Sequence, residues 1–203
     1  MGQDCSAHPT EREGPRNRAR GKQQLAKLGV QDSKKFGSDK TAQARRKALA
    51  NQIIVHAQVA KVQIVEVAEI DQYTFRGQLN QLERLTAINL LQQLGIAFNA
   101  KIVCDGERLF SPLNQQFPNL LAINRGESAY IEIAAASILA KHTRDEQFAA
   151  IVNKYAHQFG EFAGGGYINA ATTRFLAMYQ AHYGQLPNEA RKSWGAKKIQ
   201  ISF

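Results

Sequence analysis

The spacing of apolar side chains along the chain predicts several helices and a few strands. Helices are predicted where apolar residues recur every three or four positions, over 39–53, 78–94, 129–155 and 170–183. Strands are predicted where apolar or β-branched residues alternate or cluster, over 57–67, 96–104 and 120–123. Few strands among several helices favour a sheet covered by helices over a barrel, so the predicted fold class is α/β.

Polar and glycine-rich segments divide this pattern. Residues 1–24 contain almost no hydrophobic side chains, so we expect a loosely held N-terminal segment followed by one domain over 25–203. Ser38 is of the type that caps helices and is predicted to start the first one, and Gly95 is predicted to end the second. Three glycines at 164–166 predict a flexible joint, with a helical C-terminal extension beyond it.

Composition narrows the class of protein. The 203 residues include 26 Lys and Arg against 17 Asp and Glu, which gives a net charge of +9 and a pI near 9.7. Basic residues concentrate in 27–47 and again in 191–198, as expected of a protein that holds a phosphate backbone at two places. Two cysteines are too few for a disulfide framework, and no run approaches the roughly 18 apolar residues of a membrane span. We therefore expect a cytoplasmic protein that does not enter the membrane.

Two carboxylates stand where α/β proteins often place their chemistry. Asp105 follows an apolar run, and Glu127 precedes a helix rich in small residues. Strand ends open into ligand-binding crevices, and two convergent carboxylates suit Mg²⁺ or Mn²⁺. Each acid also has an ordinary structural explanation, because Asp-Gly turns are common and helix dipoles favour an acid at the N-terminus. Together they favour a metal-assisted enzyme, whereas Glu107 is expected to be a solvated charge.

Candidate phosphate contacts lie in a loop and after the triple glycine. Ser33, Lys34 and Lys35 offer a hydroxyl and two ammonium groups in a segment bounded by glycines, although a solvated loop is the ordinary alternative. Tyr167 can stack on a sugar or a base, or it can cover the core. Ser137 lies among alanines on a packed helix face and is interpreted as structural rather than as a nucleophile.

Several of these segments occur together in a recognisable order. They are 28–36 (LGVQDSKKF), 69–71 (EID), 103–106 (VCDG), 125–127 (RGE), 133–145 (IAAASILAKHTRD), 166–167 (GY) and 191–194 (RKSW). In this order, over about residues 25–195, the chain resembles the type 2 ribonuclease H family, ribonucleases HII and HIII. The alanine-rich segment that ends in Thr-Arg-Asp and the DSKK loop carry most of the specificity of the resemblance.

The resemblance implies a fold and a reaction. The fold is an RNase H-like mixed sheet flanked by helices. The reaction is endonucleolytic hydrolysis of the RNA strand of RNA/DNA hybrids, by two-metal catalysis with four carboxylates and Mg²⁺ or Mn²⁺. Asp105 corresponds to the third carboxylate and Glu127 to the fourth, where type HII enzymes usually have Asp and some type HIII proteins have Glu. The residues implied for substrate binding are Ser33, Lys34, Lys35, Lys141 and Tyr167, the last near the 2′-hydroxyl at an RNA–DNA junction.

The N-terminus departs from the family pattern. The family opens with a strand of pattern Gly-x-Asp-Glu-x-Gly-x-Gly that carries the first two carboxylates, whereas this chain has GQDCSAHP at 2–9. Asp4 matches the first acid, and Cys5 stands in place of the Glu. One explanation is a frameshift, a wrong start or a decayed gene, which would make the chain an impaired member. The other is that this segment folds differently and supplies acids from Asp4 and Glu11 or Glu13. We favour the first explanation and expect the first strand to be missing or altered.

Three hypotheses on function follow from these patterns. The first is a metal-dependent ribonuclease H whose partner is an RNA/DNA hybrid or an RNA–DNA junction duplex, acting as a monomer. The second is a catalytically impaired or inactive homologue that binds hybrids through its basic residues. The third is a phosphatase-like enzyme for small phosphoesters, against which the two separated basic clusters argue.

Overall fold

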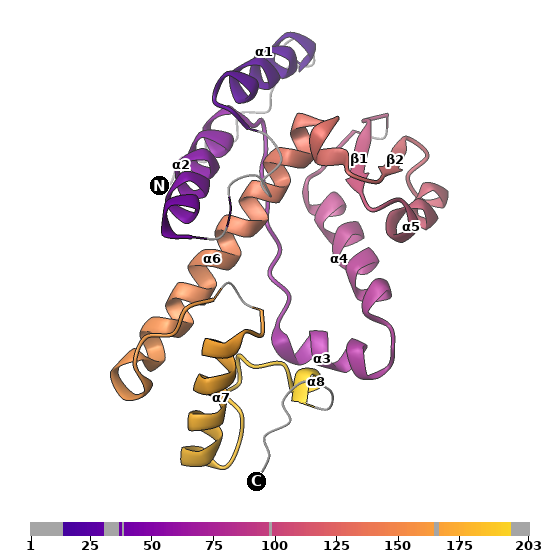
Figure 1. Cartoon of the computed structure of the whole chain (residues 1–203). Helices are drawn as coiled ribbons and strands as arrows, with labels where there is room; N and C mark the ends of the chain where they lie inside the picture. The colour runs from indigo at the N-terminus through magenta and orange to yellow at the C-terminus, as the bar shows by residue number, and fades with distance from the viewer. Residues whose placement is uncertain (1–13, 31–36, 38, 98, 165–166, 196–203) are drawn as a thin grey trace, which may run out of the picture.

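The structure is a computed structural model that describes residues 14–30, 37, 39–97, 99–164 and 167–195 (Figure 1). In chain order, with η for a 3-10 helix, its elements are α1 (Gly14–Lys27), α2 (Lys40–His56), α3 (Val67–Phe75), α4 (Leu79–Gln93), β1 (Ile102–Asp105), α5 (Glu107–Phe110), η2 (Ser111–Gln115), β2 (Leu120–Ile123), η3 (Gly126–Ser128), α6 (Ile131–Phe159), α7 (Ala170–Tyr183) and α8 (Lys192–Gly195). Within these ranges no helix combines the length and the apolar character needed to cross a membrane.

Helix α6 organises the molecule. It is 29 residues long, with α1 and α2 beside its first half, the strands near its N-terminus and α7 near its C-terminus (Figure 1). The short side chains of Ala134 and Ala135 let α2 pack closely, and Ile138 beside them is fully buried. The core cluster formed there consists of Leu25, Val30, Leu49, Ala50, Ile53, Ala134, Ala135, Ile138 and Leu139.

A buried ion pair joins α2 to α6. Arg46 is 4% exposed, its Nη2 lies 2.7 Å from Asp145 Oδ2, and its Nε donates to the same oxygen at 2.8 Å. Its Nη1 donates to the carbonyl oxygen of Gly37 at 2.9 Å. Removing either charge would leave the other buried without compensation. The pair therefore fixes α2 against α6 and ties down the chain at Gly37.

The sheet is small. Strands β1 and β2 are parallel and four residues long each, with Ile102 opposite Leu120 and Asp105 opposite Ile123. In the described part of the chain the sheet has these two strands. The strand predicted over 120–123 is confirmed. The strand predicted over 96–104 is reduced to Ile102–Asp105, because β2 offers only four residues with which to pair.

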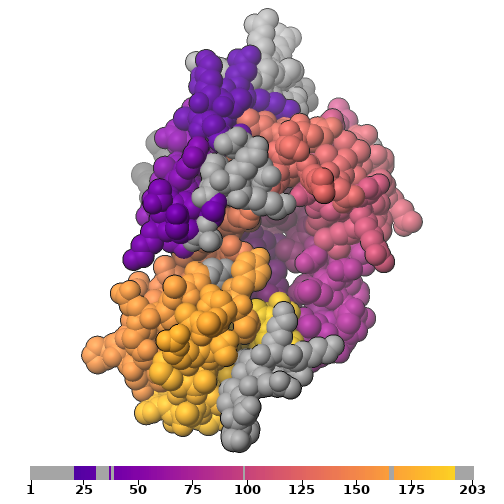
Figure 2. Space-filling model, viewed as in Figure 1, coloured from indigo at the N-terminus to yellow at the C-terminus, as the bar shows by residue number. Residues whose placement is uncertain are grey.

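The strand predicted over 57–67 is wrong. The chain between α2 and α3 has no regular structure, Val67 already belongs to α3, and Val59, Val62 and Ile64 are 51%, 44% and 53% exposed. The segment runs between α6 and α4, where the surface is hollowed (Figures 1 and 2). Its β-branched residues suit a strand, but a strand also needs a hydrogen-bonded neighbour. None of the described residues pairs with it.

Aromatic side chains form the core of the C-terminal part of the molecule. Phe175 on α7 is 3% exposed and stacks on Phe162, with ring centroids 4.1 Å apart and planes at 10°. Tyr155 and Phe159, near the end of α6, approach the Phe175 ring at 5.3 and 5.7 Å. Helix α7 occupies the residues predicted from its apolar spacing, 170–183.

The N-terminal segment is more regular than expected. Residues 14–24 belong to α1, which contradicts the loosely held segment predicted there, whereas residues 1–13 lie outside the described residues. Leu25, near the end of α1, is 7% exposed and joins the core with α2 and α6. Tertiary packing of this kind stabilises short helices that are marginal in isolation. The division of the chain at residue 24 stays a prediction.

The other helices are confirmed with small shifts at their ends. Helices α4 and α6 correspond to the helices predicted over 78–94 and 129–155. Asp39 rather than Ser38 caps α2, since its Oδ1 accepts a hydrogen bond from the Ala42 N–H at 2.7 Å. Of the predicted glycine joint, residues 165 and 166 lie outside the described residues.

Candidate functional site

The end of β1, which carries Asp105, contacts η3, which carries Glu127. Gly106 follows Asp105 with a φ of 119°, which favours glycine, and the strand ends there. Asp105 Oδ1 accepts a hydrogen bond from the backbone N–H of Gly126 at 3.0 Å. Glu127 is the next residue, so the main-chain positions of the two acids that the sequence singles out are neighbours in space, whereas the convergence of their carboxylates on one ion stays a prediction.

A tight turn sets this arrangement. Arg125, before the turn, has φ 58° and ψ 38°, a left-handed conformation that is uncommon outside glycine. Gly126 is buried, and a Cβ at this position would lie 2.4 Å from Cδ1 of Ile133. Ile133 is itself buried, so a larger residue at position 126 would displace it. The glycine of the RGE segment is thus explained physically. The backbone at Gly126 must turn sharply and pack closely against Ile133 for its N–H to reach Asp105.

Helix α6 supplies a hydrogen bond to Glu127. The hydroxyl of Ser137 donates to Glu127 Oε1 at 2.6 Å. Hydrogen bonds to an ionised acceptor are shorter and stronger than neutral ones. The sequence-based interpretation of Ser137 as structural does not include this contact with a candidate site residue.

Ser137 begins a line of polar side chains on α6. Ser137, Lys141 and Arg144 are four and three residues apart, a spacing that places them on one face of the helix, and all three are partly buried. We call this line the α6 face. At its far end Arg144 Nη1 donates to Tyr167 Oη at 2.9 Å, and the guanidinium carbon lies 4.9 Å from the ring centroid. The α6 face therefore connects Glu127 with Tyr167. The spacing of 137, 141 and 144 was a sequence signal for this arrangement.

The other predicted site residues, Asp4, Ser33, Lys34 and Lys35, lie outside the described residues. Near the last three, Gly37 is bound by Arg46, which also pairs with Asp145 on α6. The described end of the DSKK loop is thus tied to the residue that follows Arg144.

Glu107 is exposed, as expected, but it has a partner. Asn124 Nδ2 donates to Glu107 Oε2 at 2.9 Å, and the Glu107 N–H donates to Asn124 Oδ1 at 3.1 Å. This reciprocal pair links the chain after β1 to the chain after β2. Glu107 is therefore a nearby acid with a structural role of its own.

The EID and RKSW segments meet at the opposite end of the molecule, where α3 approaches α8 (Figure 1). Asp71 is 6% exposed and accepts hydrogen bonds from the N–H groups of Lys192 and Ser193 at 2.7 and 3.1 Å and from the Ser193 hydroxyl at 2.6 Å. Burial by itself raises the pKa of Asp71, but these hydrogen bonds and the charge of Arg191 outweigh it, so the pKa lies below its ordinary value. This contact is structural: it anchors the start of α8 to α3.

The carboxylates of Asp105 and Glu127 are chemically suited to a divalent ion of the magnesium type. Mg²⁺ commonly binds through one or two carboxylates together with water and substrate phosphates. Burial raises the pKa of the Cys104 thiol, which disfavours the thiolate that binds metals. Across the described ranges no three His, Cys, Asp or Glu residues form a metal-binding group. A second ion would need carboxylates from elsewhere.

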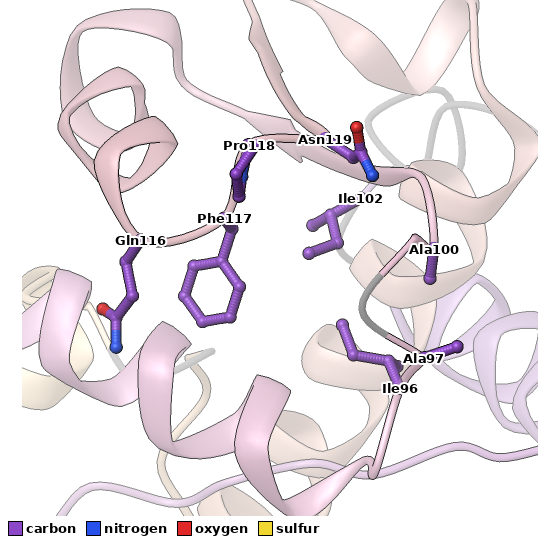
Figure 3. A pocket seen from close by; sticks show the side chains of 8 residues that line it. All are labelled: Ile96, Ala97, Ala100, Ile102, Gln116, Phe117, Pro118 and Asn119. Atoms are coloured by element: carbon purple, nitrogen blue, oxygen red, sulfur yellow. The ribbon is translucent and has the colours of Figure 1, made fainter.

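A small pocket of about 220 Å³ lies at the other end of the strands from Asp105 (Figure 3). It is lined by Ile96, Ala97, Ala100, Ile102, Gln116, Phe117, Pro118 and Asn119. These side chains carry no charge and are mostly apolar. The pocket is therefore unsuited to phosphate, and we do not assign it to the same site.

Comparison with solved structures defines the fold class. Ribonuclease H2 from Pyrococcus horikoshii superposes with a TM-score of 0.65 at 26% identity, over 89% of this chain and 84% of that one. Ribonuclease HII from Archaeoglobus fulgidus, in a complex with PCNA, has a TM-score of 0.70 at 24% identity, over 90% and 85%. The fold is thus of the RNase H-like α/β class, as the sequence predicted.

Sequence comparison identifies the family. The family model for ribonuclease HII matches residues 17–197. Ribonuclease HII of Thermococcus sibiricus is 31% identical over 182 residues, which cover 85% of this chain and 76% of the relative, and that of Pyrococcus furiosus is 29% identical over 189 residues, 89% and 80%. This chain belongs to the ribonuclease HII family, which confirms the resemblance seen in its motifs.

Proposed function

We propose that this chain is an endoribonuclease that hydrolyses the RNA strand of RNA/DNA hybrids or RNA–DNA junction duplexes. The observation that supports the proposal is the hydrogen bond from the Gly126 N–H to Asp105, which holds the turn before Glu127 against the end of β1. Paired carboxylates at strand ends suit hydrated Mg²⁺ or Mn²⁺ in phosphoryl chemistry. Membership of the ribonuclease HII family supplies the reaction class.

The α6 face suits a nucleic acid strand. Lys141 and Arg144 are cationic, and the chain as a whole has a net charge of +9. From Ser137 to Arg144 the helix rises about 10 Å, which equals about three nucleotide steps of a strand. A strand that lies along this face would pass from the two acids to Tyr167, which is 66% exposed.

Two-metal catalysis is the finer part of the proposal. Asp105 and Glu127 would hold one of the two ions, and the two ions together would supply the activation of water and the stabilisation of the leaving 3′ oxygen. The candidates for completing a second position are Asp4, Glu11 and Glu13. These three lie outside the described residues and outside the residues matched by the family model.

Hydrogen bonds from neighbouring groups orient the two carboxylates for cation binding. The Gly126 N–H and the Ser137 hydroxyl each donate to one carboxylate oxygen and restrict its rotation. Side chains already fixed in this way need less ordering when the cation and a phosphate bind. The expected product carries its phosphate at the 5′ end of the downstream piece.

A second candidate function is hybrid binding without cleavage. It is favoured by Cys5, which stands where the family pattern has a Glu. It is also favoured by the number of acids in the described site, which is two, whereas the two-metal mechanism uses four carboxylates. Both functions predict binding that weakens steeply with salt, because phosphate contacts release counterions. Only the first predicts cleavage.

The test compares Asp105→Asn with Glu107→Gln on a labelled RNA/DNA hybrid in Mg²⁺ or Mn²⁺. Asp105→Asn should lower the cleavage rate by about 10²- to 10³-fold or more, the size of effect seen when one electrostatic stabiliser is removed. Hybrid binding without metal should stay within a few-fold, because the lost acid repels phosphate. Glu107→Gln removes a neighbouring acid outside the pair and should keep the wild-type rate.

The possible results separate the two functions. Cleavage by Asp105→Asn at the wild-type rate would remove this acid from the mechanism. Salt-sensitive hybrid binding with no cleavage by the unaltered protein would favour the binding function instead.

A further inference from the structure

Helices α1 and α2 carry the net charge of the whole chain. Their sequences contain nine Lys and Arg and no Asp or Glu, and the nine are Arg16, Arg18, Arg20, Lys22, Lys27, Lys40, Arg45, Arg46 and Lys47. The other 17 Lys and Arg balance the 17 Asp and Glu, so these two helices account for the charge of +9. We call α1 and α2 together the basic layer. Positive charge is thus concentrated in one part of the molecule.

The basic layer is a fixed part of the fold. Leu25 of α1 and Ile53 of α2 are 7% and 2% exposed, in a core cluster that they share with α6. A Cβ on Gly21 of α1 would lie 3.0 Å from the carbonyl oxygen of His56, at the end of α2. The two helices therefore approach each other closely and pack on α6 as one unit.

Two ion pairs hold the basic layer beside the α6 face. Lys22 of α1 pairs with Glu132 in the first turn of α6, and Arg46 of α2 pairs with Asp145. Asp145 directly follows Arg144, the last residue of the α6 face, so α2 borders that face (Figure 1). A strand that lies along the α6 face would have the basic layer at its side.

The apolar side of α2 is buried, which leaves its other lysines toward solvent. The buried residues of α2 form one stripe and are Ala42, Arg46, Leu49, Ala50 and Ile53. Lys40 and Lys47 are seven residues apart, so they share the side of the helix away from that stripe, and both are exposed. Lys27, at the end of α1, is exposed as well. Charges of one sign repel each other and destabilise the compact state, whereas a polyanion would relieve that repulsion.

We infer that the basic layer binds phosphates of duplex DNA, independently of the sugar and outside the candidate cleavage site. The inference rests on the nucleic acid binding of the proposed function. Across a groove the two strands of a duplex are about 6–12 Å apart, and packed helices lie about 8–10 Å apart. A duplex with one strand on the α6 face would therefore bring phosphates of its other strand to the neighbouring helix. Phosphate contacts carry no sequence information, so the layer adds affinity for any duplex.

The test is the salt dependence of binding in EDTA, measured by fluorescence anisotropy on a DNA duplex and on an RNA/DNA hybrid of the same sequence. The layer variant, Lys27→Gln/Lys47→Gln, removes two exposed charges of the basic layer. The slope of log affinity against log salt should become shallower by about 1.8 for both duplexes, since each phosphate contact contributes about 0.9. Between about 50 and 200 mM salt, this change corresponds to a loss of affinity that is about tenfold smaller than in the wild type.

The matched control is Arg76→Gln/Arg174→Gln. It removes the same charge from exposed positions after α3 and on α7, outside the basic layer. Its slope should stay close to that of the wild type. The midpoint of urea unfolding should be unchanged in both double variants, because all four residues are exposed.

The outcomes separate failure of the inference from failure of the proposed function. Equal changes of slope in the two double variants would overturn the inference, because net charge and not the basic layer would then set the affinity. A change confined to the hybrid would overturn the sugar-independent role. Vesicles of phosphatidylserine that bind the wild type but not the layer variant, with the duplex slopes unchanged, would assign the layer to a membrane instead.

Two further results concern the proposed function itself. A layer-dependent slope in a protein that cleaves no hybrid would leave the inference standing and overturn the endoribonuclease. If the unaltered protein binds neither duplex, the inference and the proposed function fall together.

Discussion

The aromatic region around α7 and the region of β1 and β2 reach order by different routes. Phe162, Phe175 and their neighbours come from one stretch of chain that folds back on itself, so each ring finds its partner nearby in sequence. The strands depend on backbone partners from distant segments, and in the described chain β1 pairs only with β2. Two-stranded pairs are marginal without further packing. Here α6, which packs against β1, contributes to that packing.

The two candidate site acids lie in the less densely packed of these two regions. The two acids lie at the sheet end of α6, and the dense aromatic cluster lies at the other end of the same helix (Figure 1). Helix α6 is fixed at its C-terminal half by aromatic packing and at its middle by the Arg46–Asp145 pair. A long helix held in this way provides a rigid support for Ser137 and Arg144, independently of how extensive the sheet is.

The largest expected effect is in the aromatic region. Phe175→Ala should lower the free energy of unfolding by about 3–5 kcal/mol, because it opens a cavity among stacked rings. Phe75→Ala, at a residue 64% exposed, is the matched control and should stay within about 0.5 kcal/mol. Urea unfolding of both variants measures the difference. Equal losses would mean that the aromatic cluster does not hold this region.

An intermediate effect is expected at Asp71, outside the two regions, where α3 is joined to α8. Asp71→Asn places an amide group against N–H and hydroxyl donors and should lower the free energy of unfolding by about 1–3 kcal/mol near neutral pH. Glu69→Gln, two residues earlier and exposed, is the control and should change little.

The same substitution has a pH signature. The pKa of Asp71 is lowered in the folded protein, so its stabilising contribution is complete above the unfolded value of about 3.9 and is lost as pH falls through the folded value. The gap in unfolding free energy between the wild type and Asp71→Asn should therefore narrow below about pH 4. If the difference in unfolding free energy does not change with pH, the charge of Asp71 does not contribute to holding α8 against α3.

The smallest effect is expected in the unpaired segment between α2 and α3. Ile64→Thr, at a residue 53% exposed, should change the free energy of unfolding by no more than about 0.5 kcal/mol. Leu120→Ala in β2, where the residue is 5% exposed, should cost about 2–5 kcal/mol and serves as the comparison. A large loss for Ile64→Thr would mean that this segment is buried in solution and belongs to the sheet.

The candidate site was partly predictable. Asp105 and Glu127 were singled out because two acids, one after an apolar run and one before a helix, together suit a divalent cation, although each alone has an ordinary structural explanation. The hydrogen bond between Asp105 and the Gly126 N–H was not predicted. Ser137 and Arg144 were not assigned to the site. Helical spacing predicts that they share one face of the helix, but it does not predict which residues of other segments contact that face. Their partners Glu127 and Tyr167 come from other segments, at distances that only packing sets.

The sequence by itself determined the helices α2, α4, α6 and α7, the β2 segment and the position of the two acids along the chain, because side-chain periodicity and glycine placement act over a few residues. Tertiary structure alone decided that 57–66 stays unpaired, that β1 is cut to four residues and that Ser137 and Arg144 face the candidate site. Hydrogen bonds between strands and contacts between distant side chains depend on which segments of the chain pack next to one another. That information is spread over the whole chain and is not contained in any one segment.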